Sequence, residues 1–148
     1  MHVEESVVIN QPVEKVFGYV SNPANQPEWA GPVVDVHDLQ QTAPGESREG
    51  DRFTLVAKFL GRQVDSPSEV TAYEPNRRFS TRVTGGPIPD QKWTYTFEEA
   101  SGGTRLSQSV EAEPGNFFKL AGPLLERALK RQFRNDLETL KDLLEAQG

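Results

Sequence analysis

The C-terminal stretch from Asn116 to Ala146 reads NFFKLAGPLLERALKRQFRNDLETLKDLLEA, and its apolar residues need a surface on which to pack. Its apolar residues recur at helical spacing and predict one long helix with a continuous apolar stripe. A helix of about 30 residues is roughly 45 Å long. In water such a helix is stable only when its stripe packs along another surface. Gly122-Pro123 is expected to kink or interrupt the helix near its start.

The segment that precedes this helix predicts the surface on which it packs. Residues 3–9 are typical of a strand, and residues 13–20 predict a short helix capped by Asn10 or Gln11. A second short helix is predicted over residues 23–29. Six further strands are predicted, at 33–39, 50–60, 63–73, 78–84, around Trp93–Phe97, and at 104–111. Short strands joined by hairpin turns favour an antiparallel meander over βαβ units.

The order of these elements predicts an α+β fold in a single domain that covers residues 1–148. A curved seven-stranded antiparallel sheet wraps around the long C-terminal helix, and two short helices follow the first strand. A strongly twisted antiparallel sheet curls, and a curled sheet around a helix need not close at both ends. The expected consequence is an internal cavity between the sheet and the C-terminal helix.

Composition argues against several classes of function. The chain has no cysteine and only two histidines, so no metal site is expected. Neither a phosphate-binding loop nor a dinucleotide fingerprint is present, so no cofactor is expected either. The net charge of −6 disfavours nucleic acid as a partner. No apolar run is long enough for integral membrane association, and a cytoplasmic monomer or homodimer is the default expectation.

One basic stretch departs from this acidic balance. Residues 126–134 read ERALKRQFR, and their helical spacing predicts a solvated face with Glu126 and Lys130 as an i,i+4 pair. The alternative is a surface that engages another protein.

Five motifs in order resemble a known pattern. They are VVINQPVEKVF at 7–17, the Asn22-Pro23 to Trp29 segment, YEPNRRF at 73–79, and YTFE at 95–98 with GGTRL at 102–106, followed by the closing helix. Together they resemble the START-like, or SRPBCC, superfamily over essentially the whole chain. The similarity is greatest to its bacterial polyketide cyclase/dehydrase and lipid-transport branch.

This resemblance implies a helix-grip fold with a hydrophobic cavity between the sheet and the C-terminal helix. It does not imply an activity, because one fold hosts many functions. The superfamily includes aromatic cyclases, lipid carriers, hormone and alkaloid binders, ubiquinone-binding proteins and co-chaperone domains.

Candidate ligand-binding residues follow from strand alternation. Trp93 and Tyr95 share a sheet face with Phe97 and could stack on a ring or donate a hydrogen bond, although ordinary core packing is the alternative. Gln108 falls between two inward apolar residues, so it needs a partner or lines a polar pocket. Arg82 could anchor an anion, although its polar neighbours along the strand suggest a solvent-facing row.

The remaining candidates would form the wall and mouth of the cavity. They are Trp29 near the second helix, Phe59, Ser66 and Ser68 on the strands, and Phe117, Phe118 and Leu125 at the start of the closing helix. The small serines would leave space, and the apolar residues exceed what one core-facing stripe requires. His37 has no visible catalytic partner, and no nucleophile motif such as G-x-S-x-G occurs.

Three functional hypotheses remain open at this point. The first is binding or transport of a small hydrophobic ligand, such as a lipid, a polyketide-like aromatic or a quinone. The second is a polyketide cyclase or dehydratase that acts in the same cavity, with an acid or base supplied by Tyr95, Arg82, Gln108 or His37. The third is a protein-interaction module of the co-chaperone kind, which predicts a filled core.

Overall fold

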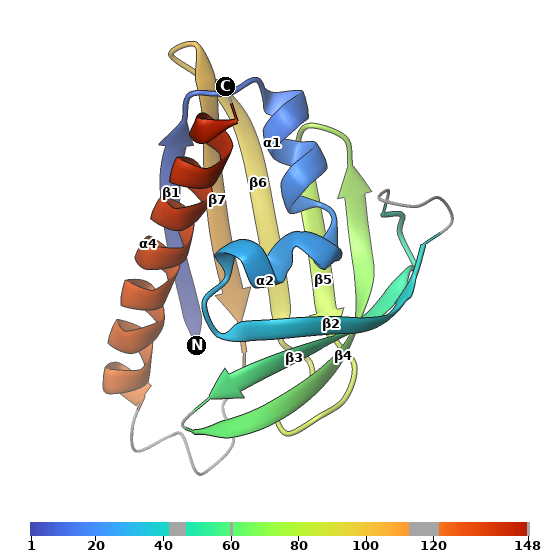
Figure 1. Ribbon diagram of the computed structural model, residues 1–148. Coiled ribbons are helices and arrows are strands. Elements are labelled where there is room, and N and C mark those ends of the chain that lie inside the picture. The colour runs from blue at the N-terminus through green and yellow to red at the C-terminus, as the bar shows by residue number, and fades with distance from the viewer. Residues whose placement is uncertain (42–46, 60, 113–121, 148) are drawn as a thin grey trace.

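Seven strands form one antiparallel sheet in the order β1-β7-β6-β5-β4-β3-β2. The computed structural model describes residues 1–41, 47–59, 61–112 and 122–147 (Figure 1). The strands are β1 (His2–Ile9), β2 (Val33–Gln40), β3 (Arg52–Phe59), β4 (Arg62–Glu74), β5 (Arg78–Val83), β6 (Lys92–Ala100) and β7 (Gly103–Glu111). Consecutive strands from β2 to β7 are neighbours, and β1 pairs with β7. The predicted antiparallel meander is confirmed.

The helices lie on one face of this sheet, which is called the inner face below. They are α1 (Val13–Val20), the 3-10 helix η1 (Pro23–Asn25), α2 (Gln26–Trp29) and α4 (Gly122–Ala146). Figure 1 shows α1 and α2 in front of β5 and β6, and α4 alongside β1. The predicted long C-terminal helix is confirmed from Gly122 onward, and its predicted first residues, 116–121, lie outside the described ranges. Gly122-Pro123 falls in the first turn of the described helix, where proline is well tolerated.

One end of the inner face is closed by packed aromatic and aliphatic side chains. The apolar stripe of α1 is buried, and its Phe17 ring lies 5.0 Å from the ring of Phe97 and 5.2 Å from that of Tyr73. Leu140 and Leu144 of α4 are fully buried in the same cluster. This end of the inner face is called the closed end below, and it is defined by Phe17, Tyr73, Phe97, Leu140 and Leu144.

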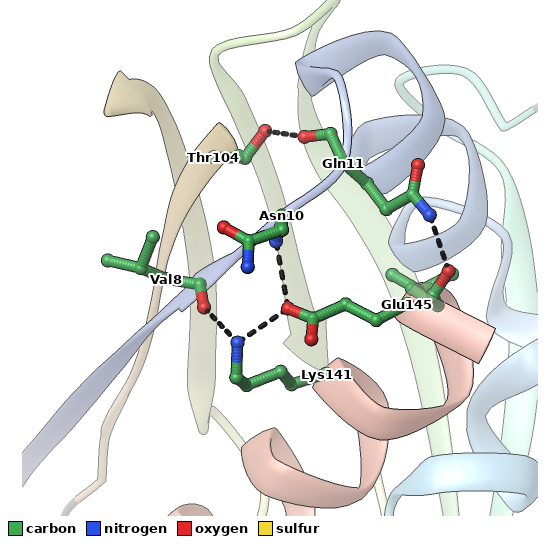
Figure 2. A network of polar contacts seen from close by, with 7 residues as sticks. Val8, Asn10, Gln11, Thr104, Lys141 and Glu145 are labelled. Atoms are coloured by element: carbon green, nitrogen blue, oxygen red, sulfur yellow. Dashed lines mark hydrogen bonds and ion pairs between the residues drawn. The ribbon is translucent and has the colours of Figure 1, made fainter. Parts of the chain in front are cut away.

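A polar network fixes the closed end to the last turns of α4 (Figure 2). The side-chain amide of Gln11 donates to the carbonyl oxygen of Leu144 at 2.8 Å, and the backbone oxygen of Gln11 accepts from the hydroxyl of Thr104 at 2.8 Å. Lys141 Nζ donates to the carbonyl oxygen of Val8 at 2.9 Å. The expectation that Asn10 or Gln11 caps α1 is wrong, because no side chain caps that helix and Gln11 instead donates to the carbonyl of Leu144 near the C-terminal end of α4.

β-Bulges decide which side chains of two strands reach the inner face. A register shift in β4 between Val70 and Ala72 turns Tyr73 inward, where it pairs with Phe79. In β2 the half-buried residues are Val33, Val36 and Leu39, which are three positions apart instead of the two positions of a regular strand. Two register shifts in the pairing of β2 with β3 account for this spacing. Bulges insert an unpaired residue and reverse the alternation beyond it.

The opposite end of the inner face is less filled. Leu55, Ser66 and Trp93 point to the helix side of the sheet, yet each is only partly buried. Leu125 and Leu129, in the first half of α4, are also partly buried. This end of the inner face is called the open end below, and it is defined by Leu55, Ser66, Trp93, Leu125 and Leu129. Figure 1 shows that β3 and β4 bend out of the plane of β5–β7 and extend toward the N-terminal end of α4.

Candidate functional site

A polar group lies in the middle of the inner face, between the closed and the open end. The register of β6 with β7 places Tyr95 opposite Gln108, and both side chains are buried. The amide nitrogen of Gln108 lies 3.4 Å from the hydroxyl oxygen of Tyr95. Trp29, the last residue of α2, packs edge-on against the Tyr95 ring at 6.1 Å. Three residues that the sequence predicts as ligand-binding are therefore adjacent in the structure.

Asp136 of α4 completes this group. Its Oδ1 accepts a hydrogen bond from the backbone N–H of Gly31 at 3.0 Å and from Nε2 of Gln132 at 2.7 Å. A Cβ atom on Gly31 would lie 2.9 Å from that Nε2, so a larger residue here would displace the Gln132 side chain from its place beside Asp136. Burial raises the pKa of the Asp136 carboxyl, while these two hydrogen bonds act in the opposite direction. Trp29, Tyr95, Gln108 and Asp136 are called the central cluster below.

Asp136 is a site residue that the sequence pattern alone does not single out, although its position falls within the apolar stripe of the C-terminal helix. The signal available was a carboxylate at a core-facing position, which must find donors to be buried. Thr81 was missed in the same way. It lies opposite Trp93 on the inner face and is buried, and it occupies an inward position between Phe79 and Val83.

The electrostatics of the central cluster keep Tyr95 neutral. Burial raises the pKa of its hydroxyl, the hydrogen bond from Gln108 lowers it, and the charge of Asp136 raises it further. The net shift is upward, so the Tyr95 hydroxyl stays protonated at physiological pH. It can donate or accept a hydrogen bond, but it cannot serve as a general base from an ionised state.

Trp93 lies one register step from the central cluster, toward the open end. Its ring centroid is 5.6 Å from that of Phe133, and its indole nitrogen donates to the side-chain oxygen of Gln91 at 3.2 Å. Ser66 and Ser68 also face inward, opposite Leu55 and Phe53 respectively. These positions lie on the same face as the central cluster, as strand alternation predicts.

Arg82 does not lie with the other candidates. It stands opposite Glu69 and Lys92, so it points to the outer face of the sheet, and its guanidinium contacts Asp90 at 2.8 Å and Glu69 at 3.4 Å. The polar neighbours of Arg82 in β5 were the signal for this placement. His37 is exposed on β2 beside Asp38.

Three further candidates are not placed. Phe117, Phe118 and the side chain of Phe59 lie outside the described part of the structure. Leu125 is described and stands on the first half of α4.

Two of the hollows among the described residues are bounded without the central cluster. One, of about 560 Å³, lies among the basic side chains of α4 from Arg127 to Asn135. The other, of about 340 Å³, lies beside the turn between β4 and β5. Across the described ranges, no group of three or more metal-ligating side chains is positioned to hold an ion. No helix in those ranges has the length and apolar character to cross a membrane.

A seven-stranded antiparallel sheet that holds a long C-terminal helix defines the helix-grip, or START-like, class of proteins. Residues 1–145 match the family model described as "Polyketide cyclase / dehydrase and lipid transport". The chain belongs to this family, which confirms the resemblance drawn from its sequence motifs.

Solved structures of the same fold are similar over almost the whole chain. A START superfamily protein from Mycobacterium smegmatis has a TM-score of 0.79 at 16% identity, with 99% of each chain covered. A protein from Thermus thermophilus has a TM-score of 0.75 at 18% identity, with 100% of this chain and 99% of the other covered. The di-domain ARO/CYC StfQ from the steffimycin biosynthetic pathway has a TM-score of 0.76 at 15% identity. That match covers 99% of this chain and 51% of StfQ. No curated protein is significantly similar in sequence.

Proposed function

We propose that this protein binds or carries a small, predominantly apolar molecule on the inner face of the sheet, at the open end. The observation that supports the proposal is the uneven filling of the inner face, whose apolar residues form two separate clusters. At the closed end, Phe97 and Leu140 are almost fully buried, whereas at the open end Leu55 and Trp93 retain exposed surface. Apolar surface that stays accessible beside a few inward polar groups is typical of a ligand site.

Membership of a family described by both cyclases and lipid transport is consistent with such a site. The ligand would enter beside the first half of α4, where none of the described residues from Gly122 to Gln132 is fully buried. Lipids, polyketide-like aromatics and quinones remain the candidate ligand classes.

The test fills the open end and measures uptake of an uncharged fluorescent apolar probe, N-phenyl-1-naphthylamine, by titration. Ser66→Leu adds volume on the inner face, and it is expected to weaken probe binding at least tenfold. Gln63→Leu is the matched control, because it adds the same side chain to the exposed outer face of the same strand. Equal binding by wild type and both variants would contradict the proposed location, and absence of binding by the folded wild type would contradict the function.

A second candidate function, a cyclase or dehydratase, is favoured by one observation. The central cluster buries a neutral Tyr95 hydroxyl beside Gln108, and such a hydroxyl can polarise a carbonyl oxygen of a polyketone. In this role Tyr95→Phe is expected to abolish turnover of a linear polyketone analogue, followed by the absorbance of its aromatic product. Arg82→Ala is the control, because Arg82 lies on the outer face. Turnover that Tyr95→Phe leaves unchanged would exclude this role.

A further inference from the structure

Two buried polar atoms at the central cluster have no hydrogen-bond partner. Among the described residues they are Nε1 of Trp29 and Oε1 of Gln108, and both side chains are at most 3% exposed. A buried polar group without a partner costs about 1–3 kcal/mol, so folded proteins rarely leave one unexplained. Here two of them adjoin the same residue.

Both unpartnered atoms belong to side chains that contact Tyr95. Trp29 packs against the ring, and Gln108 contacts the hydroxyl with the other end of its amide. The two ends of an amide are assigned from hydrogen bonding. If the Gln108 amide is turned over, its oxygen faces Tyr95 and its nitrogen becomes the unpartnered atom. One end is unsatisfied in either orientation.

The central cluster stands where the open end begins. Tyr95 and Gln108 form one cross-strand pair, and Trp93 and Val110 form the next pair on the same face, toward the open end. Two residues along a strand correspond to about 6.8 Å. A ring or short chain that occupies the open end beside Trp93 would therefore place its inner terminus at the Tyr95–Gln108 pair.

The chemistry of the unpartnered atoms selects the group that belongs at this terminus. The indole N–H of Trp29 requires an acceptor, and the carbonyl of Gln108 requires a donor. A hydroxyl group provides both and also suits the turned amide. An alkyl or unsubstituted aryl terminus provides neither.

A carboxylate terminus is disfavoured. The carboxyl of Asp136 is close enough to raise the pKa of Tyr95 by its charge, so a second anion would be repelled. The arginine that could have compensated, Arg82, lies on the outer face.

We infer that the ligand is an apolar molecule with a neutral hydroxyl group, which binds to Nε1 of Trp29 and the side-chain amide of Gln108 at the floor of the open end. This inference rests on the proposed binding function and narrows its ligand class. It favours phenols and alcohols over hydrocarbons and fatty-acid anions.

The experiment compares three probes of similar size by isothermal titration calorimetry: 2-naphthol, 2-methylnaphthalene and 2-naphthoate. The wild-type protein is expected to bind 2-naphthol about tenfold more tightly than 2-methylnaphthalene, which corresponds to one good hydrogen bond. Binding of 2-naphthoate is expected to be the weakest. Gln108→Leu is expected to remove the preference for 2-naphthol while it retains binding of 2-methylnaphthalene, and circular dichroism checks that the variant folds.

A second readout uses the two tryptophans. In a ¹H–¹⁵N spectrum, the indole N–H resonance of Trp29 is expected to shift on addition of 2-naphthol. The indole N–H of Trp93 already has a partner in Gln91 but lies beside the proposed ligand, so its resonance is expected to shift alike with 2-naphthol and 2-methylnaphthalene, whereas that of Trp29 responds to the hydroxyl. Trp93→Phe assigns the two resonances. This measurement does not depend on any variant of Gln108.

The outcomes separate the inference from the function on which it rests. Equal binding of 2-naphthol and 2-methylnaphthalene, with a silent Trp29 indole, would overturn the inference and leave the apolar site standing; a resident buried water would give this result. Binding of none of the three probes to folded wild-type protein would overturn the proposed function as well.

Discussion

The two halves of α4 differ in how they are held, although they form one continuous helix. All five buried residues of α4 lie between Phe133 and Leu144; residues 122–132 are called the first half of the helix below, and residues 133–146 the second half. In the first half, Leu124 is 70% exposed and no described residue is fully buried. The second half is held by a packed core and by the Gln11–Leu144 hydrogen bond (Figure 2). Regions with few buried contacts open at lower free energy, and binding regions are commonly among them.

This comparison suggests a division of roles within the fold. The closed end supplies stability, and under the proposed function the open end is left less packed so that it accepts a ligand. Each of the following substitutions tests one side of that division, from the largest expected effect to the smallest.

Leu140→Ala is expected to have the largest effect. Leu140 is fully buried at the closed end, and truncation of a buried leucine costs about 2–5 kcal/mol in the free energy of unfolding. The matched control is Leu124→Ala in the first half of the same helix, which is expected to change stability by less than about 0.5 kcal/mol. Urea denaturation measures both, and equal losses would show that the two halves are packed alike.

Gln11→Ala is expected to have the next largest effect. The substitution removes one of the two donors to the carbonyl of Leu144 and leaves only the backbone N–H of Gln147 at 3.3 Å, which costs about 0.5–1.5 kcal/mol in the free energy of unfolding. Gln63→Ala removes an exposed glutamine and serves as the control. Chemical denaturation compares the two variants, and a Gln11→Ala protein as stable as the control would mean that water replaces this contact.

The order of elements could be predicted from the sequence, because helical and strand periodicities change at clear turn signals. The inward positions of Tyr95 and Gln108 also followed from alternation, since β6 and β7 pair without a bulge. The inward turn of Tyr73 could not be predicted, because it depends on a bulge that one strand's own pattern does not reveal. The contact between Asp136 and Gly31 joins residues far apart in the sequence, and only the tertiary packing of α4 on the α2–β2 corner creates it.

A pH-dependent effect is expected from Asp136, between the two ends. Its pKa is raised in the folded protein, so the folded state binds this proton more tightly than the unfolded state. The contribution of the group to stability is therefore full at low pH. It declines as the pH rises from the ordinary value of about 3.9 through the folded-state pKa.

Asp136→Asn removes this titration and keeps an oxygen that can accept from Gly31. The free energy of unfolding of the variant minus that of the wild type is therefore expected to increase as the pH rises from about 3.9 through the folded-state pKa of Asp136. The increase is expected to be about 1 kcal/mol or less. Asp142→Asn, on an exposed position of the same helix, is the control. Urea denaturation from pH 3 to pH 8 provides the curves, and parallel curves for wild type and Asp136→Asn would contradict the expectation.

The smallest effect is expected from the ion pair that links Arg134 to Glu5 of β1. Arg134 Nε lies 3.1 Å from Glu5 Oε1, and the arginine side chain is 67% exposed. Because solvent and salt screen an exposed pair, Arg134→Gln is expected to cost less than about 1 kcal/mol, and less still at high salt. Arg131→Gln is the control, since Arg131 has no ion pair within the described ranges.

Arg134→Gln also tests whether the two halves of α4 open independently, because its effect on amide hydrogen exchange can be located along the helix. Arg134 lies at the boundary between the two halves. If the turns that precede it are held only by partial packing and screened contacts, Arg134→Gln should accelerate amide hydrogen exchange in those turns and leave the turns after Leu137 protected, since the latter rest on the buried core. Exchange measured by mass spectrometry on peptides from the two halves resolves this difference. A uniform acceleration along α4 would mean that the helix opens as one unit. The open end would then depend on the closed end for its order, and ligand uptake there would require the whole grip of the sheet on α4 to loosen.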